Sequence, residues 1–322
     1  MAKLSEQMKK ELKAEKEYKK NHKRLYKLTA GDVVFHIINY TIFILFALLC
    51  FFPFYYIFIN TISEPEHVIR QAITFWPKGF TLEAYKRVIK VNDIGTAFMV
   101  TLARTVFGTA LMVISSGLVG YLVTKKEMWH RKIWYRMFVV TMYFNAGIIP
   151  WFLNMSMLGL TNNFMAYIIP GIVAPYNIIL VKTYIESIPA EMEESAYIDG
   201  AGFMTIFWKI IWPLSKPILA TITIFGAVGS WNSFTDSLIL MKSAANLQTL
   251  QHKLYIYLNQ SSNLASLFNT PGSTPNSAMM NMQYTIVIKY TISMITIIPI
   301  LVVYPFMSKY FEEGIMLGAV KG

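Results

Sequence analysis

The most distinctive chemical pattern in the sequence is a short acidic stretch, residues 191–200, between two long apolar runs. Three of its first four residues are glutamates, which the positive end of a helix dipole stabilises in the first turn. Ala196 is small enough to let another backbone approach closely. Asp199-Gly200 predicts the helix end, because glycine adopts the left-handed conformation without strain. The chemistry that these residues offer is recognition of another protein by a short, rigid helix.

The segment that follows is amphipathic. Apolar residues recur at the spacing of one helix face, and two tryptophans flank that face; the residues are Phe203, Ile206, Phe207, Ile210 and Ile211, with Trp208 and Trp212. Residue chemistry alone permits two interpretations. The segment is either a helix lying on the surface of a bilayer or the second half of an ordered docking loop.

Catalytic and metal-binding chemistry finds little support in the sequence. Cys50 is the single cysteine and lies in an apolar run, and the five histidines include no pair at helical spacing. No Gly-x-x-x-x-Gly-Lys-Ser/Thr phosphate loop occurs, so any ATP hydrolysis must take place on another polypeptide. The chain is therefore expected to bind no metal and no cofactor.

The elements that carry these residues are predicted to cross a membrane. The 322 residues are 55% hydrophobic and 15% charged, compared with about 25% charged residues in soluble domains. Pro170-Gly171 and Pro175 predict a kink in the fourth of six apolar segments, each with the roughly 20 residues that a spanning helix requires. These segments are 33–62, 95–124, 133–153, 163–186, 217–240 and 285–306. The predicted fold class is all-α, a polytopic membrane protein with six transmembrane helices.

The distribution of lysine and arginine predicts the orientation. The four connecting and terminal segments on the N-terminal side carry eighteen of these residues, whereas the three on the opposite side carry seven. Positive charge concentrates on the cytoplasmic side of membrane proteins, so both termini and the loop 187–216 are expected in the cytoplasm. The basic residues do not interleave with aromatic residues on one exposed face, which disfavours a nucleic-acid partner.

The acidic stretch also fits a longer pattern: Glu-Ala-Ala, three residues, Gly, nine residues, Ile, one residue, Leu-Pro. Glu194-Ser195-Ala196, Gly200, Ile210 and Pro213 match it, while Ser195 and Trp212 replace the usual Ala and Leu. In this pattern the chain resembles the membrane permease subunits of binding-protein-dependent, ATP-driven importers. Serine is nearly as small as alanine, so close docking remains feasible.

Three further motifs resemble the maltose-type carbohydrate branch of that family. They are residues 76–82 (Trp-Pro-Lys-Gly-Phe-Thr-Leu), the Trp231-Asn232 pair and the C-terminal segment 310–322. Within the branch, residues 144–150 before the turn at 158–160 look most like permeases of complex-saccharide importers in Gram-positive bacteria.

The resemblance implies a type I ABC importer permease fold with three regions. A basic cytoplasmic segment, 1–32, precedes a six-helix transmembrane domain, 33–306, which contains a docking loop at 187–213; a cytoplasmic tail, 307–322, follows. The implied partners are a second, different permease, two cytoplasmic ATPase subunits that bind ATP and Mg, an extracytoplasmic sugar-binding lipoprotein and membrane lipid. The chain itself would be no enzyme, and it would reside in a bacterial cell membrane.

The resemblance also assigns roles to residues. The ATPase-docking residues would be Glu191, Glu194, Ser195, Ala196, Asp199, Gly200, Ile210 and Pro213. The tail residues Gly318, Lys321 and Gly322 would reach between the ATPases, and the alternative for them is a plain polar tail.

Asp236 is the only carboxylate well inside a predicted span, one helical turn beyond Asn232 and near Trp231. Because tryptophan stacks on sugar faces and the polar pair can bond hydroxyls, we expect these three to line the sugar path, with Tyr143 and Asn145 as further candidates. The alternative is that Trp231 packs against the partner permease and that Asp236 sits near the outer interface. We also consider pairing of Arg104 with a partner subunit.

Two other functions remain open. The docking pattern is shared across substrates, so one alternative is an importer that carries a non-sugar solute. A stand-alone secondary transporter would show inverted repeats or several intramembrane charges, and the sequence shows neither.

Overall fold

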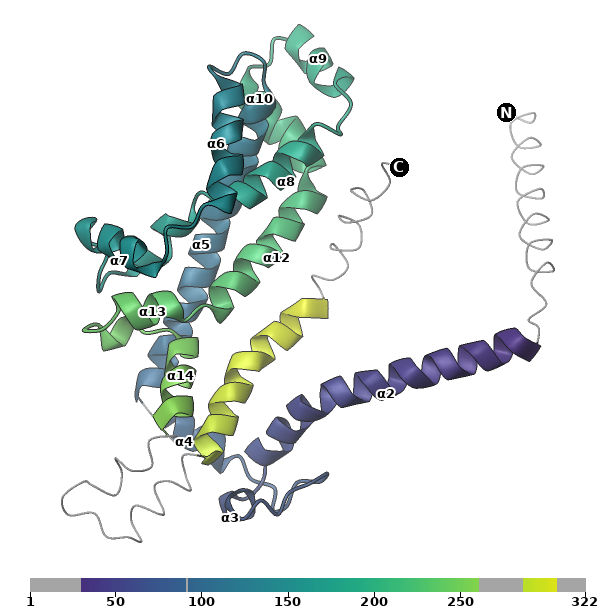
Figure 1. Cartoon of the computed structure of the whole chain (residues 1–322), viewed down its shortest axis with the longest axis vertical. Coiled ribbons are helices and arrows are strands. Elements are labelled where there is room, and N and C mark those ends of the chain that lie inside the picture. Colours follow the sequence, from purple (N-terminus) through teal and green to yellow (C-terminus); the bar gives the residue numbers. More distant parts are fainter. Residues whose placement is uncertain (1–29, 91, 261–285, 306–322) are drawn as a thin grey trace. The chain divides into compact units, whose positions relative to one another are not determined.

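The computed structural model describes residues 30–90, 92–260 and 286–305. These residues form helices that are connected by loops. Ser63 and Phe80, in the loops on either side of α3, form an isolated β-bridge. The chain divides into two compact units, Met1–Tyr56 and Ile57–Gly322. Figure 1 shows the helices in order along the chain.

Helix α2 (Ala30–Thr61) begins in the first unit and ends in the second. Its 32 residues include Pro53. At 1.5 Å per residue they extend about 48 Å, more than the roughly 30 Å of a bilayer core. The helix is long and apolar enough to cross a membrane, and it corresponds to the first predicted span.

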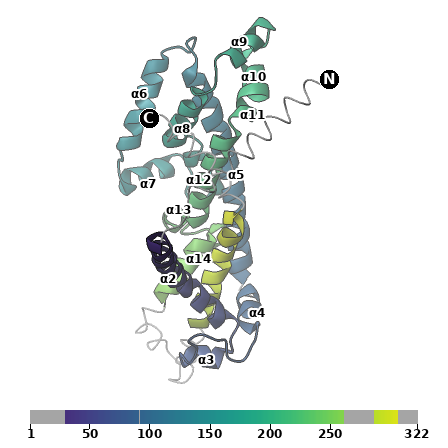
Figure 2. The ribbon, with the colours of Figure 1, turned by 90° about the vertical axis from the view of Figure 1, so that its right-hand side faces the viewer.

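The unit 57–322 is built around α5 (Asn92–Thr124), which packs against α8 (Pro175–Ile185) and α12 (Lys216–Asn232). In Figures 1 and 2 these three helices lie side by side. Gly120 on α5 permits the close approach of α8, because a Cβ there would lie 3.2 Å from the Ile178 carbonyl. Gly117 leaves room for the Trp212 ring, which would lie 2.8 Å from a Cβ at that position. The apolar core of the unit forms at this junction.

The ends of the unit carry shorter helices. Helices α3 (Pro65–Ile69) and α4 (Glu83–Lys90) lie at the end opposite α9 (Glu191–Ile198), as Figure 2 shows. Helix α4 begins directly after the Trp-Pro-Lys-Gly-Phe-Thr-Leu motif at 76–82. Helix α14 (Leu250–Gln260) is preceded by η4 (Ala245–Leu247).

The predicted third span, 133–153, is not one helix. It is divided into α6 (Arg131–Tyr143) and α7 (Ile148–Met157), because Phe144 is extended and Gly147 takes a φ of 89°. The 13 and 10 residues of the two helices are each too few to cross a bilayer alone.

Two further spans are broken. The fourth consists of η1 (Phe164–Tyr167), η2 (Ile169–Gly171) and α8, with a bend of 41° that confirms the predicted kink. The fifth ends at Asn232, and α13 (Thr235–Leu240) forms a separate short helix. Among the described residues, three helices, including Ile286–Pro305, suffice to cross a membrane, or up to five spans if each bent pair counts as one. The number six is therefore not established.

Several expectations fall outside the described residues. They concern the basic N-terminal segment and the tail residues Gly318, Lys321 and Gly322.

The close α5–α8 contact generates a stability prediction. Gly120→Leu would force the two helices apart, because the Val181 side chain and the Ile178 carbonyl already lie within 3.2 Å of a Cβ at Gly120. Overpacking of this kind costs about 1–3 kcal/mol, and we expect a lower thermal midpoint of the purified protein in detergent. Gly95→Leu is the matched control, since nothing lies within 4 Å of a Cβ at Gly95. Equal midpoints for the two variants would contradict the packing argument.

Candidate functional site

The acidic helix forms as the sequence predicts. Three glutamates occupy the first turn of α9, and Gly200 ends the helix with a φ of 82°. The backbone N–H of Ala201 donates to the Ala196 carbonyl at 2.9 Å, and that of Gly200 donates to the Tyr197 carbonyl at 3.0 Å. These two bonds form a Schellman motif, which satisfies the last carbonyls and fixes the helix end.

One face of α9 is anchored to the core. Glu193 forms an ion pair with Lys125, and Lys125 also lies 4.2 Å from the ring centroid of Tyr121. Ala196 is buried in the same apolar cluster as Tyr121 and Phe207, whose rings are 5.4 Å apart. The predicted small residue therefore serves packing against the chain's own core. A rigid joint between α9 and the end of α5 results.

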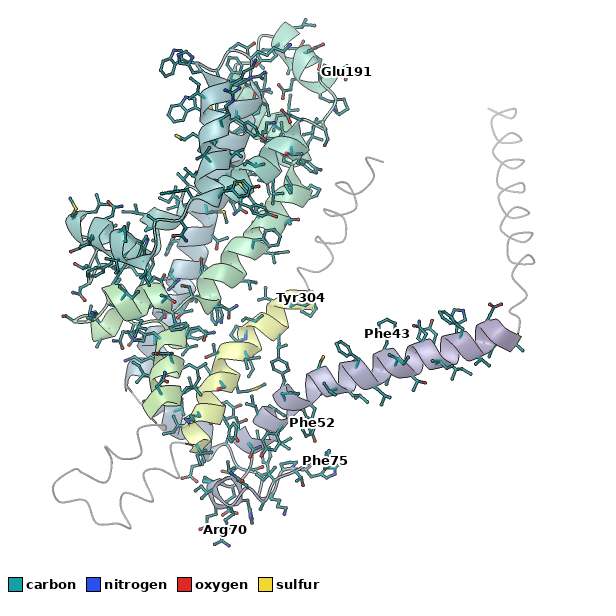
Figure 3. All side chains as sticks on the ribbon, in the orientation of Figure 1. Phe43, Phe52, Arg70, Phe75, Glu191 and Tyr304 are labelled. Atoms are coloured by element: carbon teal, nitrogen blue, oxygen red, sulfur yellow. The ribbon has the colours of Figure 1, made fainter. Side chains whose placement is uncertain are left out.

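The other face of α9 is exposed. It carries four of the predicted docking residues, namely Glu191, Glu194, Ser195 and Asp199, and Figure 3 shows Glu191 at this end of the unit. Ile198, which was not singled out from the sequence, is 87% exposed, and Met192 is exposed as well. The signal for Ile198 was a bulky apolar residue next to the helix stop. The exposed surface thus combines negative charge with a protruding apolar side chain.

The amphipathic segment packs inward. After α10 (Phe203–Ile206), residues Phe207–Ile211 form the π-helix η3, followed by α11 (Trp212–Leu214). Ile206, Phe207 and Ile211 are fully buried, which favours the ordered docking loop over a helix merely lying on a bilayer. The axis then bends by 80° into α12. Of the predicted docking residues here, Ile210 is half-buried and Pro213 is exposed.

A buried ion pair lies in the half of the unit farther from α9. Arg104 on α5 donates to both carboxylate oxygens of Asp236, at 2.8 and 3.3 Å, and only 3% of Arg104 is exposed. Asp236 also accepts from the Ser233 hydroxyl at 3.0 Å and from the Ser237 N–H at 2.9 Å. Pairing of Arg104 with a partner subunit was considered from the sequence, but its partner is in the same chain. Asp236 lies in the first turn of α13, beyond the end of α12.

Further polar contacts join four elements at this pair. The Arg104 guanidinium lies 4.5 Å from the ring centroid of Tyr167 on η1, and the Tyr167 hydroxyl donates to the Leu247 carbonyl at 2.7 Å. Ser237 on α13 shares a 2.9 Å hydrogen bond with Nδ1 of His252 on α14. Burial lowers the pKa of His252, which favours its neutral form.

The other predicted substrate-path residues are separated. Trp231 is buried, and its indole N–H donates to the Thr296 carbonyl at 3.0 Å. It lines a pocket of about 200 Å³ whose other walls are almost entirely apolar. Asn232 accepts from the Gln251 amide at 3.2 Å. Tyr143 and Asn145 lie exposed at the break between α6 and α7. Trp231, Asn232 and Asp236 therefore each bond to a different part of this chain, namely Thr296, Gln251 and Arg104.

The described residues contain no group of three or more His, Cys, Asp or Glu side chains that could hold a metal ion.

Comparisons with known proteins place this geometry in context. No protein-family model matches the chain. Protein LplC of Bacillus subtilis is 34% identical over 270 residues, covering 84% of this chain and 89% of LplC. The polygalacturonan/rhamnogalacturonan transport system permease protein YtcP of the same organism is 32% identical over 291 residues, covering 90% and 99%. A crystal structure of a bacterial ABC transporter involved in import of the acidic polysaccharide alginate matches with 31% identity and a TM-score of 0.75, covering 89% and 99%.

The buried ion pair generates a double-mutant prediction. Asp236→Asn would leave the Arg104 charge buried and unpaired, which costs about 3–5 kcal/mol. The double variant Arg104→Gln/Asp236→Asn removes both charges, and we expect it to lose less stability than Asp236→Asn alone. Thermal midpoints of the purified protein in detergent provide the measurement. A loss in the double variant equal to the sum of the losses in Asp236→Asn and in Arg104→Gln would show that the two charges do not depend on each other.

Proposed function

Because this chain belongs to the permease subunits of ABC importers, we propose that it forms one half of the path by which an oligosaccharide crosses the bacterial cell membrane. The proposal further assigns it a second, different permease, two cytoplasmic ATPases and an extracytoplasmic sugar-binding lipoprotein as partners. ATP and Mg are bound by the ATPases, and the chain itself performs no catalysis. Both termini and the docking loop face the cytoplasm, as the excess of basic residues on that side indicates.

The observation that carries the proposal is the two-faced α9. Its exposed face offers Glu191, Glu194 and the protruding Ile198, while its inner face is tied to the core by Glu193 and Ala196. A protein that binds the outer face and moves would therefore displace the helix as a rigid body. The Schellman motif at Gly200 keeps the last turn of the helix closed.

The movement has two routes into the membrane segments. Lys125 follows directly after α5, so displacement of Glu193 acts on that helix. Phe207 and Ile211 in η3 are packed beside Leu219 of α12. Since α5, α8 and α12 share one core, binding outside the membrane shifts the equilibrium between two arrangements of these helices.

Carbohydrate is the proposed cargo because YtcP and the alginate transporter are both named for transport of polysaccharides. Of the docking residues given for the loop 187–213, Ala196 is proposed to hold α9 against the core and the others to contact the ATPase. The tail residues Gly318, Lys321 and Gly322 are proposed to reach between the ATPases. For Trp231 and Asp236, the packing supports a role in shaping the path by holding helices together.

The partners are tested by co-purification from a mild detergent. We expect a tagged form of this chain to recover a second permease and an ATPase subunit, both identified by mass spectrometry. Recovery of the chain alone, under conditions that preserve its fold, would contradict the proposal and favour a stand-alone transporter.

The docking face generates a sharper prediction. Ile198→Asp replaces an apolar side chain that is 87% exposed with a charge, and we expect at least tenfold less ATPase in the co-purified complex. A buried charge at an interface is costly, whereas the same charge in water is not. Met157→Asp is the matched control, because Met157 is also 87% exposed but lies at the end of α7. Normal ATPase recovery with Ile198→Asp would remove Ile198 from the interface.

A further inference from the structure

A pocket of about 270 Å³ lies among α5, the broken fourth span and α12. None of the residues predicted to line the sugar path borders this pocket. Thr109 places it near the middle of α5, and Gly171, Ala174 and Asn177 place it at the break between η2 and α8. We call it the midspan pocket. In membrane proteins, interrupted helices at this depth are tolerated where they line a cavity or a binding site.

The pocket exists because small residues replace side chains along its walls. On α12, Gly226, Gly229 and Ser230 are three and four residues apart and so face the same side. Nothing lies within 4 Å of a Cβ built at Gly229 or at Gly171, so both positions border open space. A volume slightly below the roughly 300 Å³ of the smallest drug-sized sites suits one ring unit, not a whole oligosaccharide.

Two polar side chains in the wall have unused hydrogen-bonding capacity. Thr109 is only 5% exposed, and its hydroxyl has no hydrogen-bond partner among the described residues. Other threonines in these helices donate to the carbonyl four residues earlier, as Thr101 does to Ala97 at 2.8 Å. Asn177 is also buried, and its amide N–H₂ donates to the Met112 sulfur, a weak acceptor. Burying an unpartnered polar group is costly, and because Thr109 and Asn177 both line the midspan pocket, a hydrogen-bonding ligand there would satisfy them.

The walls also define the charge of that ligand. None of the residues that line the pocket is charged in the part of the chain that the structure describes. The charge of Arg104, which contacts the Tyr167 ring, is neutralised by Asp236 at 2.8 Å. An acidic ring would therefore be buried without a counter-charge, whereas hydroxyl groups would find Thr109, Asn177 and Ser230. Phe225, 39% exposed, adds an aromatic face for the C–H side of a ring.

We propose that the midspan pocket binds one uncharged sugar ring of the transported saccharide, with Thr109 and Asn177 hydrogen-bonding to its hydroxyls. The assignment rests on the proposed function, since it takes the cargo to be a saccharide. It places selectivity for neutral rings within this subunit, in addition to any selectivity of a binding protein.

The test uses the complete importer in proteoliposomes and a panel of labelled trisaccharides, with neutral members such as arabinotriose and acidic members such as trigalacturonate. For the best-transported neutral member, Thr109→Val and Asn177→Leu are each expected to raise the KM for uptake about tenfold. Thr109→Ser keeps the hydroxyl, and we expect its KM to be close to that of the unaltered importer. Gly229→Leu, which fills the pocket, should reduce uptake without touching either polar group.

Thr105→Val is the matched control. Thr105 lies one turn before Thr109 on the same helix and its hydroxyl is also unpartnered among the described residues, but it lines the apolar pocket beside Trp231. We expect its KM to equal that of the unaltered importer. Co-purification of the subunits with every variant separates loss of assembly from loss of binding.

Three results would overturn the assignment. An unchanged KM with both Thr109→Val and Asn177→Leu would show that the pocket does not bind the sugar. Transport of acidic members alone would refute an uncharged ring while leaving the proposed function intact. Transport of no saccharide by an assembled complex with active ATPases would refute the carbohydrate cargo, and the pocket assignment with it.

Discussion

A bilayer core offers no water, so every charge and every broken helix must be satisfied by the protein itself. The Arg104–Asp236 pair is the clearest case, because it lets a nearly fully buried arginine reside in α5. Asp236 can reach Arg104 only because α12 ends at Asn232 and α13 starts as a separate helix. The break in the fifth span therefore allows the charge in the second span to be paired. Tyr167 of the fourth span contacts the Arg104 guanidinium, and His252 of α14 bonds to Ser237 beside Asp236.

The opposite end of the unit is organised by rigidity. There α9 is closed by Gly200, held by Glu193 and Ala196, and continued by the buried side chains of η3. Between the two ends, the small residues of α5 and α12 leave a hollow beside the break in the fourth span. The unit thus has the rigid helix α9 at one end, the Arg104–Asp236 ion pair in its other half and the midspan pocket between them. This arrangement suits the proposed subunit, which alternates between two conformations around a bound solute.

Local features were predictable from the sequence, and long-range ones were not. The acidic helix and its stop depend on neighbouring residues, so a one-dimensional pattern reveals them, as Pro170 and Pro175 reveal the kink in the fourth span. The division of 133–153 was missed because apolar composition alone does not distinguish one helix from two. The pairing of Arg104 with Asp236 joins residues 132 positions apart, and no local signal encodes such a contact. The unpartnered Thr109 hydroxyl is also invisible in the sequence, since most helical threonines bond their own backbone.

The 132-residue separation of the Arg104–Asp236 pair has a consequence for biosynthesis. Ribosomes add roughly 5–20 residues per second, so the arginine precedes its counter-ion by about 7–26 s. During that interval α5 must enter the membrane with an uncompensated charge, which costs about 2.5–3.5 kcal/mol on insertion scales. Nascent α5 would therefore remain near the insertion machinery, or hold its arginine toward the lipid head groups, until α13 has been synthesised.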